Sequence, residues 1–346
     1  AFVYISPIGD LGWTWAHNEG RLAIEKAFGS RVETTFIENV PETEEAAVMI
    51  RDLAAQNYHL IFTTSFGLMD PTIEVAKEFP NTWFVHISGY KTAPNVSTVF
   101  GRMEIPRYLS GIVAGEATKE NHLGYVAAFD IPEVVRGINA FTLGVRSVQP
   151  EAEVHVLYTY TWFDPAVEEQ AAQALLDQGA DVLAQHQDSR ATSLTARAEG
   201  AFSIGYDSDM SRFAGESVLT SPVWNWGAKY VEIVQQVLDN TYQSESYYGS
   251  DIVGLAPFSF LVDARTQSLV RKQEAEIRAG KSDIFCGPIR SNTDVLVVEE
   301  GKCLTDEELL SMDWYVEGVV ADAPAEAKSG RGETSSKVPA WRSGEP

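Results

Sequence analysis

Short apolar runs rich in β-branched residues alternate along the chain with segments whose apolar residues recur at helical spacing. The strand-like runs are FVYISPI, RVETTFIENV, HLIFTTSF, TWFVHIS, HLGYVAAF, EVHVLYTY, DVLAQHQ and FSIGYD. The helical segments fall near residues 13–28, 43–56, 70–78, 106–119, 137–148, 165–179 and 192–200. This alternation predicts parallel sheets whose strands are joined by right-handed helical crossovers.

The strand–helix units fall into two groups, one before about residue 102 and one after it. We therefore expect an α/β fold with two doubly wound lobes rather than one sheet. The expected lobes are residues 1–102 plus 223–250, and residues 103–222 plus 251–321. Residues 322–346 lack apolar periodicity and are rich in Pro, Gly, Ser and charge, which predicts a disordered tail.

The composition excludes some classes of partner. The formal net charge of −23 argues against nucleic acid and anionic membrane surfaces, because both require a basic face. No segment approaches the ~18–20 apolar residues of a membrane span. The sequence starts in a strand-like run without an initiator Met, so we expect a mature chain whose N-terminus has been trimmed.

The chain has two cysteines, Cys286 and Cys303, and no CxxC motif, which makes a thiolate metal site improbable. They flank a segment that has the pattern of a strand, a turn and a second strand. In an oxidising compartment this pair is a candidate disulfide, and the alternative is two buried free thiols.

Aromatic and polar residues gather where the predicted strands end, which is where open α/β sheets bind ligands. The first junction, GDLGWTWAHNEG, places Trp13, Thr14 and His17 on one face of a helix start, directly after Asp10. We interpret Trp13 as a stacking surface with a polar rim, and Trp15 as packing. The alternative for Trp13 is a hydrophobic staple.

Trp162 occupies the corresponding junction of the second half, and two tryptophans, one from each lobe, are suited to hold a flat heterocycle between them. Phe66 is a candidate for a further wall. Carboxylates and amides near the junctions are candidates to recognise ring N–H and NH2 groups, and they are Asp10, Glu104, Gln187, Asp188 and Asp207. Any single Asp is alternatively a helix N-cap, the role we assign to Asp164 and Asp209.

The sequence contains no GxSxG, HExxH, Walker or GxGxxG motif, and no His has a partner four residues away. We therefore expect neither an enzyme nor a metal or other cofactor. His186 is a second-rank candidate for ligand contact. An enzyme that uses Asp10 or His17 as acid or base on a purine remains the competing hypothesis.

The opening motif resembles that of the basic membrane protein family of periplasmic binding proteins, the purine and nucleoside receptors of ABC importers. The family signature Asp-x-Ser-Phe-Asn, followed by a helix ending in Glu-Gly, aligns with Asp10, Glu19 and Gly20. Trp13 stands in place of the stacking Phe, and Thr14 in place of the Asn.

Further motifs extend the resemblance over residues 2–320. The second stacking Phe of the family falls on Trp162, two residues before Asp164, and its Gly-x-Asp-Ser-Asp and Leu-Thr-Ser stretches are residues 205–209 and 219–221. The resemblance implies two lobes of type I periplasmic binding protein architecture, joined by three crossings and closing on a ligand by hinge motion. It also implies permease subunits as partners.

One departure from the family pattern bears on the ligand. Nucleoside receptors of the family carry a Lys near the ribose, and Trp224 stands at that place here. We therefore expect a free purine base of the adenine or guanine type, with a nucleoside as the alternative. We further expect a monomeric periplasmic protein, with a lipid-anchored form as the alternative. Transport and sensing are not distinguished by sequence, and the effector-binding half of a transcription factor shares the fold.

Overall fold

The computed structural model describes residues 1–321, and the tail expected at residues 322–346 lies outside the described residues. The chain divides into two units. Unit 1 consists of Ala1–Arg102 and Trp224–Gly254, and unit 2 consists of Met103–Val223 and the chain from Leu255 onward. The backbone therefore passes between the units at three places in the sequence.

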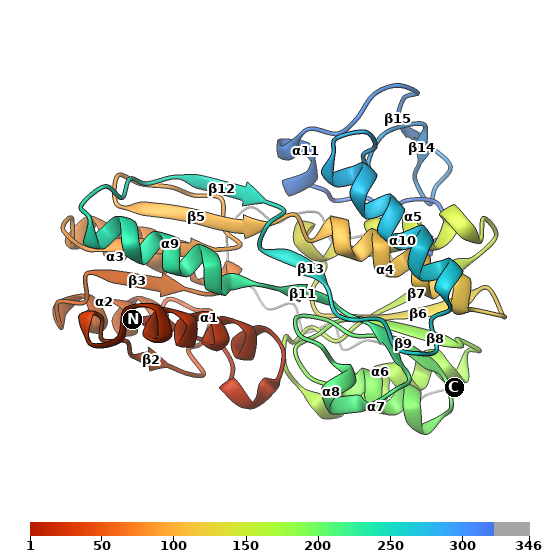
Figure 1. Ribbon diagram of the computed structural model, residues 1–346, viewed down its shortest axis with the longest axis horizontal. Helices are drawn as coiled ribbons and strands as arrows, with labels where there is room; N and C mark the ends of the chain where they lie inside the picture. Colours follow the sequence, from red (N-terminus) through yellow and green to blue (C-terminus); the bar gives the residue numbers. More distant parts are fainter. Residues whose placement is uncertain (322–346) are drawn as a thin grey trace. The chain divides into compact units, whose positions relative to one another are not determined.

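Unit 1 is built on a six-stranded parallel sheet with the strand order β12-β5-β4-β3-β1-β2 (Figure 1). Its strands are β1 Phe2–Val3, β2 Phe36–Ile37, β3 Leu60–Thr63, β4 Trp83–Ile87, β5 Val96–Gly101 and β12 Ser246–Gly249. Its helices are α1 Trp13–Phe28, α2 Ala46–Ala55, α3 Met69–Glu78 and α9 Trp226–Leu238, with 3-10 turns η1 Ile8–Asp10, η2 Gly29–Arg31 and η3 Phe66–Leu68.

Apolar side chains cover both faces of this sheet because successive strand residues point to opposite sides. Phe2 and Phe62 stack with their ring centroids 4.5 Å apart, and both contact Tyr230 of α9. Val3 and Ile61 belong to the core that α2 and α3 cover on the other face. Helices α1 and α9 lie side by side in Figure 1 and pack against each other.

Unit 2 has a second six-stranded parallel sheet, in the order β10-β9-β8-β6-β7-β16. Its strands are β6 His122–Ala127, β7 Glu153–Tyr158, β8 Val182–His186, β9 Phe202–Ile204, β10 Val218–Thr220 and β16 Val319–Val320. Its helices are α4 Glu104–Ala117, α5 Pro132–Val148, α6 Pro165–Asp177, α7 Ala191–Ala198, α8 Ser211–Ala214, α10 Ala264–Arg278 and α11 Asp306–Leu310. The pair β14 Ile289–Arg290 with β15 Leu296–Val298 also belongs to unit 2, whereas the residues of the pair β11 Pro222–Trp224 with β13 Val253–Leu255 are divided between the two units.

Helices α4 and α5 approach closely on one face of this sheet because glycines line their contact. A Cβ on Gly111 would lie 2.1 Å from the Phe141 carbonyl oxygen, and one on Gly144 would lie 2.0 Å from that of Tyr108. Any side chain at these positions would push the helices apart. Helices α6 and α7 cover the opposite face.

The predicted fold class, two doubly wound parallel α/β sheets, is confirmed.

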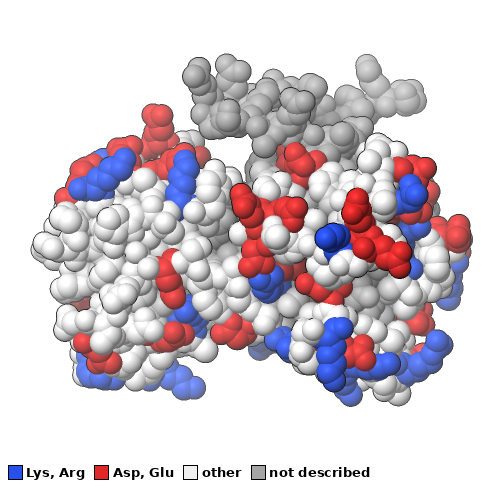
Figure 2. Space-filling model, turned by 90° about the horizontal axis from the view of Figure 1, so that it is seen from above, with Lys and Arg blue, Asp and Glu red and all other residues white. Residues whose placement is uncertain are grey.

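On the face of the molecule shown in Figure 2, acidic and basic side chains lie interspersed. Among residues 1–321, no helix combines the length and apolar character needed to cross a bilayer.

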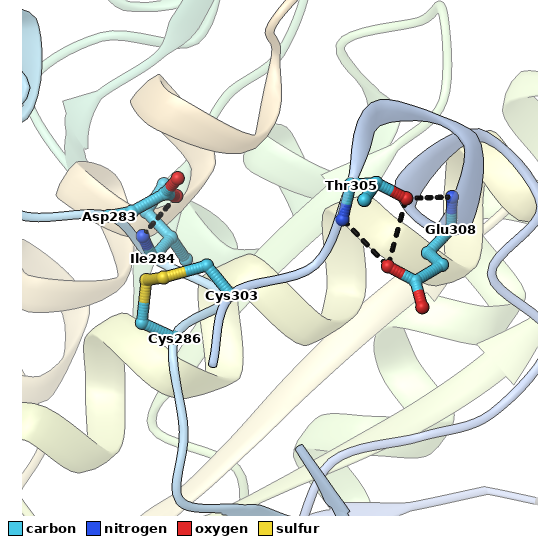
Figure 3. Close-up of a disulfide and its surroundings, with 6 residues drawn as sticks. All are labelled: Asp283, Ile284, Cys286, Cys303, Thr305 and Glu308. Carbon is cyan, nitrogen blue, oxygen red and sulfur yellow. Dashed lines mark hydrogen bonds between the residues drawn. A yellow bond between two sulfur atoms is a disulfide. The ribbon is translucent and has the colours of Figure 1, made fainter. Parts of the chain in front are cut away.

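Cys286 and Cys303 are joined by a disulfide (Figure 3). It closes a loop that carries the β14–β15 hairpin. Just beyond it, Thr305 and Glu308 form a capping box in which the Glu308 carboxylate accepts from the Thr305 N–H at 2.7 Å. The cross-link and the cap together fix the start of α11.

The disulfide generates the first prediction. The cross-linked cysteines are 17 residues apart in sequence. Closing a loop of this length in the unfolded chain stabilises a protein by about 3 kcal/mol. Replacing Cys286 and Cys303 by Ala together is expected to lower the free energy of unfolding, measured with urea, by that amount.

Thiol titration of unfolded, unreduced wild-type protein should give no reactive thiol. The same sample after reduction is the control and should give both cysteines. Two reactive thiols per chain before reduction would contradict the disulfide.

Candidate functional site

The carboxyl ends of parallel strands lie at one edge of their sheet, and most predicted ligand residues follow these ends. In unit 1 they lie after β1 and β3, and in unit 2 after β7, β8 and β9. Glu104 begins α4, and Trp224 ends β11. Because the chain divides into two units, each group of residues is described within its own unit.

The Asp10 carboxylate caps the start of α1. It accepts hydrogen bonds from the backbone N–H groups of Gly12, Thr14 and Trp15 at 2.9–3.0 Å, and from the Ser6 hydroxyl at 2.7 Å. Burial raises the pKa of Asp10 to about 6, although the hydrogen bonds act in the opposite direction. Both carboxylate oxygens are thus engaged by backbone N–H groups at the start of α1, although the N-cap residue itself is Gly12. Recognition of a ligand by Asp10 stays a prediction.

Asp164 and Asp209 were expected to be helix N-caps. Asp164 is the N-cap of α6, whereas the N-cap of α8 is Met210, so the expectation is wrong for Asp209. Asp164 accepts from two backbone N–H groups in the first turn of α6, and Asp209 accepts from the backbone N–H and hydroxyl of Ser211 in α8. Asp10 accepts from backbone N–H groups at a helix start, as Asp164 and Asp209 do, although we predicted a ligand-binding role for it.

Thr14 and His17 are also buried inside unit 1. The Thr14 hydroxyl lies 2.6 Å from that of Ser6, and His17 Nδ1 lies 2.6 Å from the Tyr230 hydroxyl of α9. Burial lowers the pKa of His17 well below its usual value, so its ring is neutral at pH 7. The predicted polar rim is thus engaged in contacts within the unit.

Trp13 belongs to a cluster of aromatic rings formed by α1, α9 and the last residue of β11. We call Trp13, His17, Trp224, Trp226 and Tyr230 the aromatic cluster. The rings of Trp224, Trp226 and His17 stack, with neighbouring centroids 4.6–4.7 Å apart. The Trp13 ring is close to perpendicular to all three, and its indole N–H donates to the Thr64 carbonyl. Trp13 is 7% exposed.

We expected Trp15 to be buried by packing and Trp13 to be open to a ligand, and the structure shows the reverse. Trp15, which we assigned to packing, is partly exposed, whereas Trp13 is buried. The sequence signal for Trp15 was the same as for Trp13, an aromatic residue at a helix start. Trp15 is therefore an additional candidate for ligand contact.

Phe66 lies in η3, directly after β3, and is partly exposed. Its ring centroid is 6.4 Å from that of Tyr90, which follows β4 and is 64% exposed. Tyr90 was not among the residues predicted from the sequence, although an aromatic residue after a strand end was the available signal. Phe66 and Tyr90 together place aromatic surface at the carboxyl edge of the unit 1 sheet.

Trp162 is partly exposed on the loop after β7. Its ring lies 5.0 Å from that of Phe129, which follows β6, and 6.2 Å from that of His186. Its carbonyl oxygen accepts from the Asp188 N–H at 3.1 Å. Contacts from the loops after β6 and β8 therefore position Trp162. Phe129, in the junction AAFDIPE, is a second residue that the sequence analysis missed.

Gln187 and Asp207 lie after neighbouring strands of unit 2 and are both buried. The Gln187 amide donates to the Thr159 hydroxyl at 2.6 Å and so ties the loop after β8 to that after β7. Asp207 has a φ of 64°, a left-handed conformation that Asp adopts more readily than most residues, and it bridges to Val223.

Glu104 and Trp224 are buried as well. The Glu104 carboxylate lies 3.7 Å from the Arg136 guanidinium, an ion pair between α4 and α5. The Trp224 ring lies over Gly101, where a Cβ would come within 2.5 Å of it, and contacts Phe100 at 5.1 Å. Glu104 is thus paired inside unit 2, and Trp224 is packed inside unit 1.

Chemically, the two sheet edges offer aromatic faces together with amide and carboxylate groups, a combination suited to a flat molecule with hydrogen-bonding edges. Within residues 1–321, no group of three or more His, Cys, Asp or Glu side chains is arranged to hold a metal ion. Solute-binding proteins and the ligand-binding parts of some transcriptional regulators have this fold.

Solved solute-binding proteins share the fold. The crystal structure of an ABC transporter solute-binding protein from Aeropyrum pernix K1 matches with a TM-score of 0.71 and 19% identity, covering 91% of this chain and 99% of that one. One from Conexibacter woesei DSM 14684 matches with a TM-score of 0.66 and 20% identity, covering 82% and 96% of the two chains.

The chain belongs to the Bmp family of PnrA-like ABC transporter substrate-binding proteins, whose family model matches residues 1–282. The family predicted from the opening motif is therefore confirmed. Family membership makes the chain a substrate-binding protein for a small molecule, with permease subunits as partners. Such proteins of ABC importers work outside the cytoplasm.

Two curated relatives cover most of the chain. A purine-binding protein of Brucella abortus (strain 2308) is 42% identical over 321 residues, which are 92% of this chain and 91% of that protein. A putative ABC transporter glucose-binding protein of Haloferax volcanii is 37% identical over 329 residues, covering 94% and 81%.

The buried histidines generate the second prediction. The pKa of His17 is lowered by burial, and that of His86 is lowered to about 3. Below pH ~6.5 the unfolded chain therefore binds more protons than the folded one, and stability falls as the pH falls. Each histidine contributes about 1.4 kcal/mol per pH unit. In urea unfolding between pH 7.5 and 5, His17→Gln should reduce the pH dependence of the free energy of unfolding by the contribution of about one proton.

The control is Tyr230→Phe, which removes the hydrogen-bond partner of His17 but not its titration. This variant should lower stability equally across the pH range. An unchanged slope in His17→Gln would contradict the neutral, buried state of His17.

Proposed function

We propose that this protein binds a free purine base and delivers it to an ABC importer. The observation that carries the proposal is the 42% identity to a purine-binding protein over nearly the whole of both chains. At this level of similarity, related chains share their fold and the placement of most site residues. The proposed ligands are adenine, guanine and related oxopurines.

The aromatic residues of the two sheet edges support this ligand class. Trp162 is partly exposed and positioned by two neighbouring loops, as a stacking surface requires. Stacking of a base on an aromatic side chain is worth about 1–3 kcal/mol. We propose Trp162 as the contact from unit 2 and Trp13 from unit 1, with Phe66 and Trp15 as further aromatic contacts.

Trp224 supports a base rather than a nucleoside. The nucleoside receptors that the sequence resembles have a lysine at this place, and an ammonium group donates hydrogen bonds to ribose hydroxyls. In this chain, a buried indole packs there against Phe100 and Trp226. It offers no cation to a sugar, so we propose that ribose adds little or nothing to the affinity.

Two other ligand classes have specific support. A nucleoside is favoured by the family resemblance, and glucose is favoured by the printed name of the Haloferax volcanii relative. A purine-modifying enzyme is the third alternative, and chromatography of purines incubated with the protein would reveal its product. We propose a monomer that does not bind nucleic acid, in keeping with its charge of −23.

The third prediction concerns ligand choice. Calorimetric titration with adenine, guanine, hypoxanthine and xanthine should show at least one base binding about tenfold or more tightly than its nucleoside. That factor corresponds to about 1.4 kcal/mol. Glucose, titrated under the same conditions, should give no heat of binding.

Adenosine or guanosine binding more tightly than every free base would move the proposal to the nucleoside class. Heat from glucose alone would identify a sugar receptor instead.

The fourth prediction concerns Trp162. Trp162→Ala should weaken binding of the preferred base about 5–150-fold, the loss of one stacking contact of ~1–3 kcal/mol. Unfolding by urea would establish that the variant is folded. The matched control is Trp83→Phe, because Trp83 is the first residue of β4 and packs against Tyr242 rather than at a carboxyl edge. Equal affinity of Trp162→Ala and wild type would remove Trp162 from the site.

A further inference from the structure

Three buried polar side chains meet in unit 2 between the sheet and the helices that cover it. Arg107 lies in the first turns of α4, Tyr125 lies on β6, and His186 is the last residue of β8. All three are at most 2% exposed.

Each of them has a polar atom without a hydrogen-bond partner among the described residues. These atoms are Arg107 Nε and Nη2, the Tyr125 hydroxyl and His186 Nδ1. Arg107 Nη1 donates to the Gln185 carbonyl at 2.6 Å, and the guanidinium lies 3.6 Å from the ring centre of Tyr206. Unpaired groups of this kind cost free energy when buried, so native proteins satisfy them with protein or ordered water.

The three groups converge on the space beside Gly137 of α5. A Cβ built on Gly137 would lie 3.5 Å from His186 Nδ1, 3.6 Å from Arg107 Nε and 3.7 Å from the Tyr125 hydroxyl. These are the nearest atoms to that point outside the local helix. Polar atoms from three different elements therefore lie around a position on α5 that carries no side chain.

The chemistry of the three atoms selects the occupant. Arg107 Nε is only a donor, and the Tyr125 hydroxyl both donates and accepts. His186 Nε2 lies 3.7 Å from the Glu133 carboxylate, which favours the proton on Nε2 and leaves Nδ1 as an acceptor. Burial, Arg107 and Arg136 lower the pKa of His186 well below its usual value, so the ring is neutral. Water matches this set, whereas an anion would face the Nδ1 lone pair.

We propose that a water molecule binds beside Gly137, accepts from Arg107, donates to His186 Nδ1 and pairs with Tyr125. It thereby holds His186 as the Nε2–H tautomer, with the donor directed toward Glu133. His186 lies at the carboxyl edge of unit 2, with its ring 6.2 Å from Trp162, so this water positions a polar group beside the proposed stacking residue. The inference does not depend on which ligand binds.

The test uses Gly137→Ala in the full chain without ligand. The added methyl meets its neighbours at ordinary contact distance, so the fold is retained, but it takes the place of the water. Nitrogen-15 NMR of wild type should show His186 with a bare Nδ1 and a protonated Nε2. In Gly137→Ala we expect this pattern to give way to a mixture of tautomers. We also expect the Tm to fall, although Ala favours a helix more than Gly does.

Gly254→Ala is the matched control, because its methyl lies 3.5 Å from a polar atom, Asn225 Nδ2, in unit 1. It should leave the His186 signals unchanged. A proton on Nδ1 in wild type, or wild-type His186 signals together with a raised Tm in Gly137→Ala, would overturn the proposal. So would bromide at this place in crystals soaked with bromide, located by anomalous scattering. A high-resolution crystal structure with water at ~2.7–3.2 Å from the three atoms would support it.

Discussion

The parallel arrangement of strands within each sheet is the constraint on which the rest of the structure depends. A parallel strand cannot be reached through a tight hairpin, so a crossover must separate each pair, and here most crossovers contain a helix. The helices cover both faces, which is why the central strands are apolar on both sides. All strand-to-helix junctions of a unit then lie at one edge, and polar and aromatic groups far apart in sequence meet there.

The polar groups at these edges serve two different purposes. Asp10, Thr14 and His17 hydrogen-bond to their own unit and determine how α1 begins and packs. Phe66, Tyr90 and Trp162 retain exposed aromatic surface that the fold itself does not use. A ligand gains most from groups of the second kind, because it does not have to replace an existing hydrogen bond.

Sequence alone was sufficient for the fold class and the family, because both depend on patterns that local sequence carries. Alternating apolar runs specify parallel sheets, and the motif around Asp10 identifies the family. The face of a helix is also readable, since Trp13 and His17 are four residues apart and lie on the same side. Sequence did not show whether this side of α1 is buried or open to a ligand. The helix that covers it, α9, lies some 200 residues later in the sequence. Sequence left open whether Asp10 binds a ligand or a helix start, because the backbone N–H groups that it contacts depend on where α1 begins.

The three passages of the chain between the units have a consequence for how the protein is made. The sheet face formed by Phe2 and Phe62 is covered by Tyr230, which is synthesised only after most of unit 2. Likewise, β16, the edge strand of the unit 2 sheet beside β7, comes from the last described residues. Neither unit can complete its core while the chain is still emerging, so an N-terminal fragment exposes apolar surface and is prone to aggregation. Maturation of this fold therefore favours a chain that is kept unfolded until it is whole.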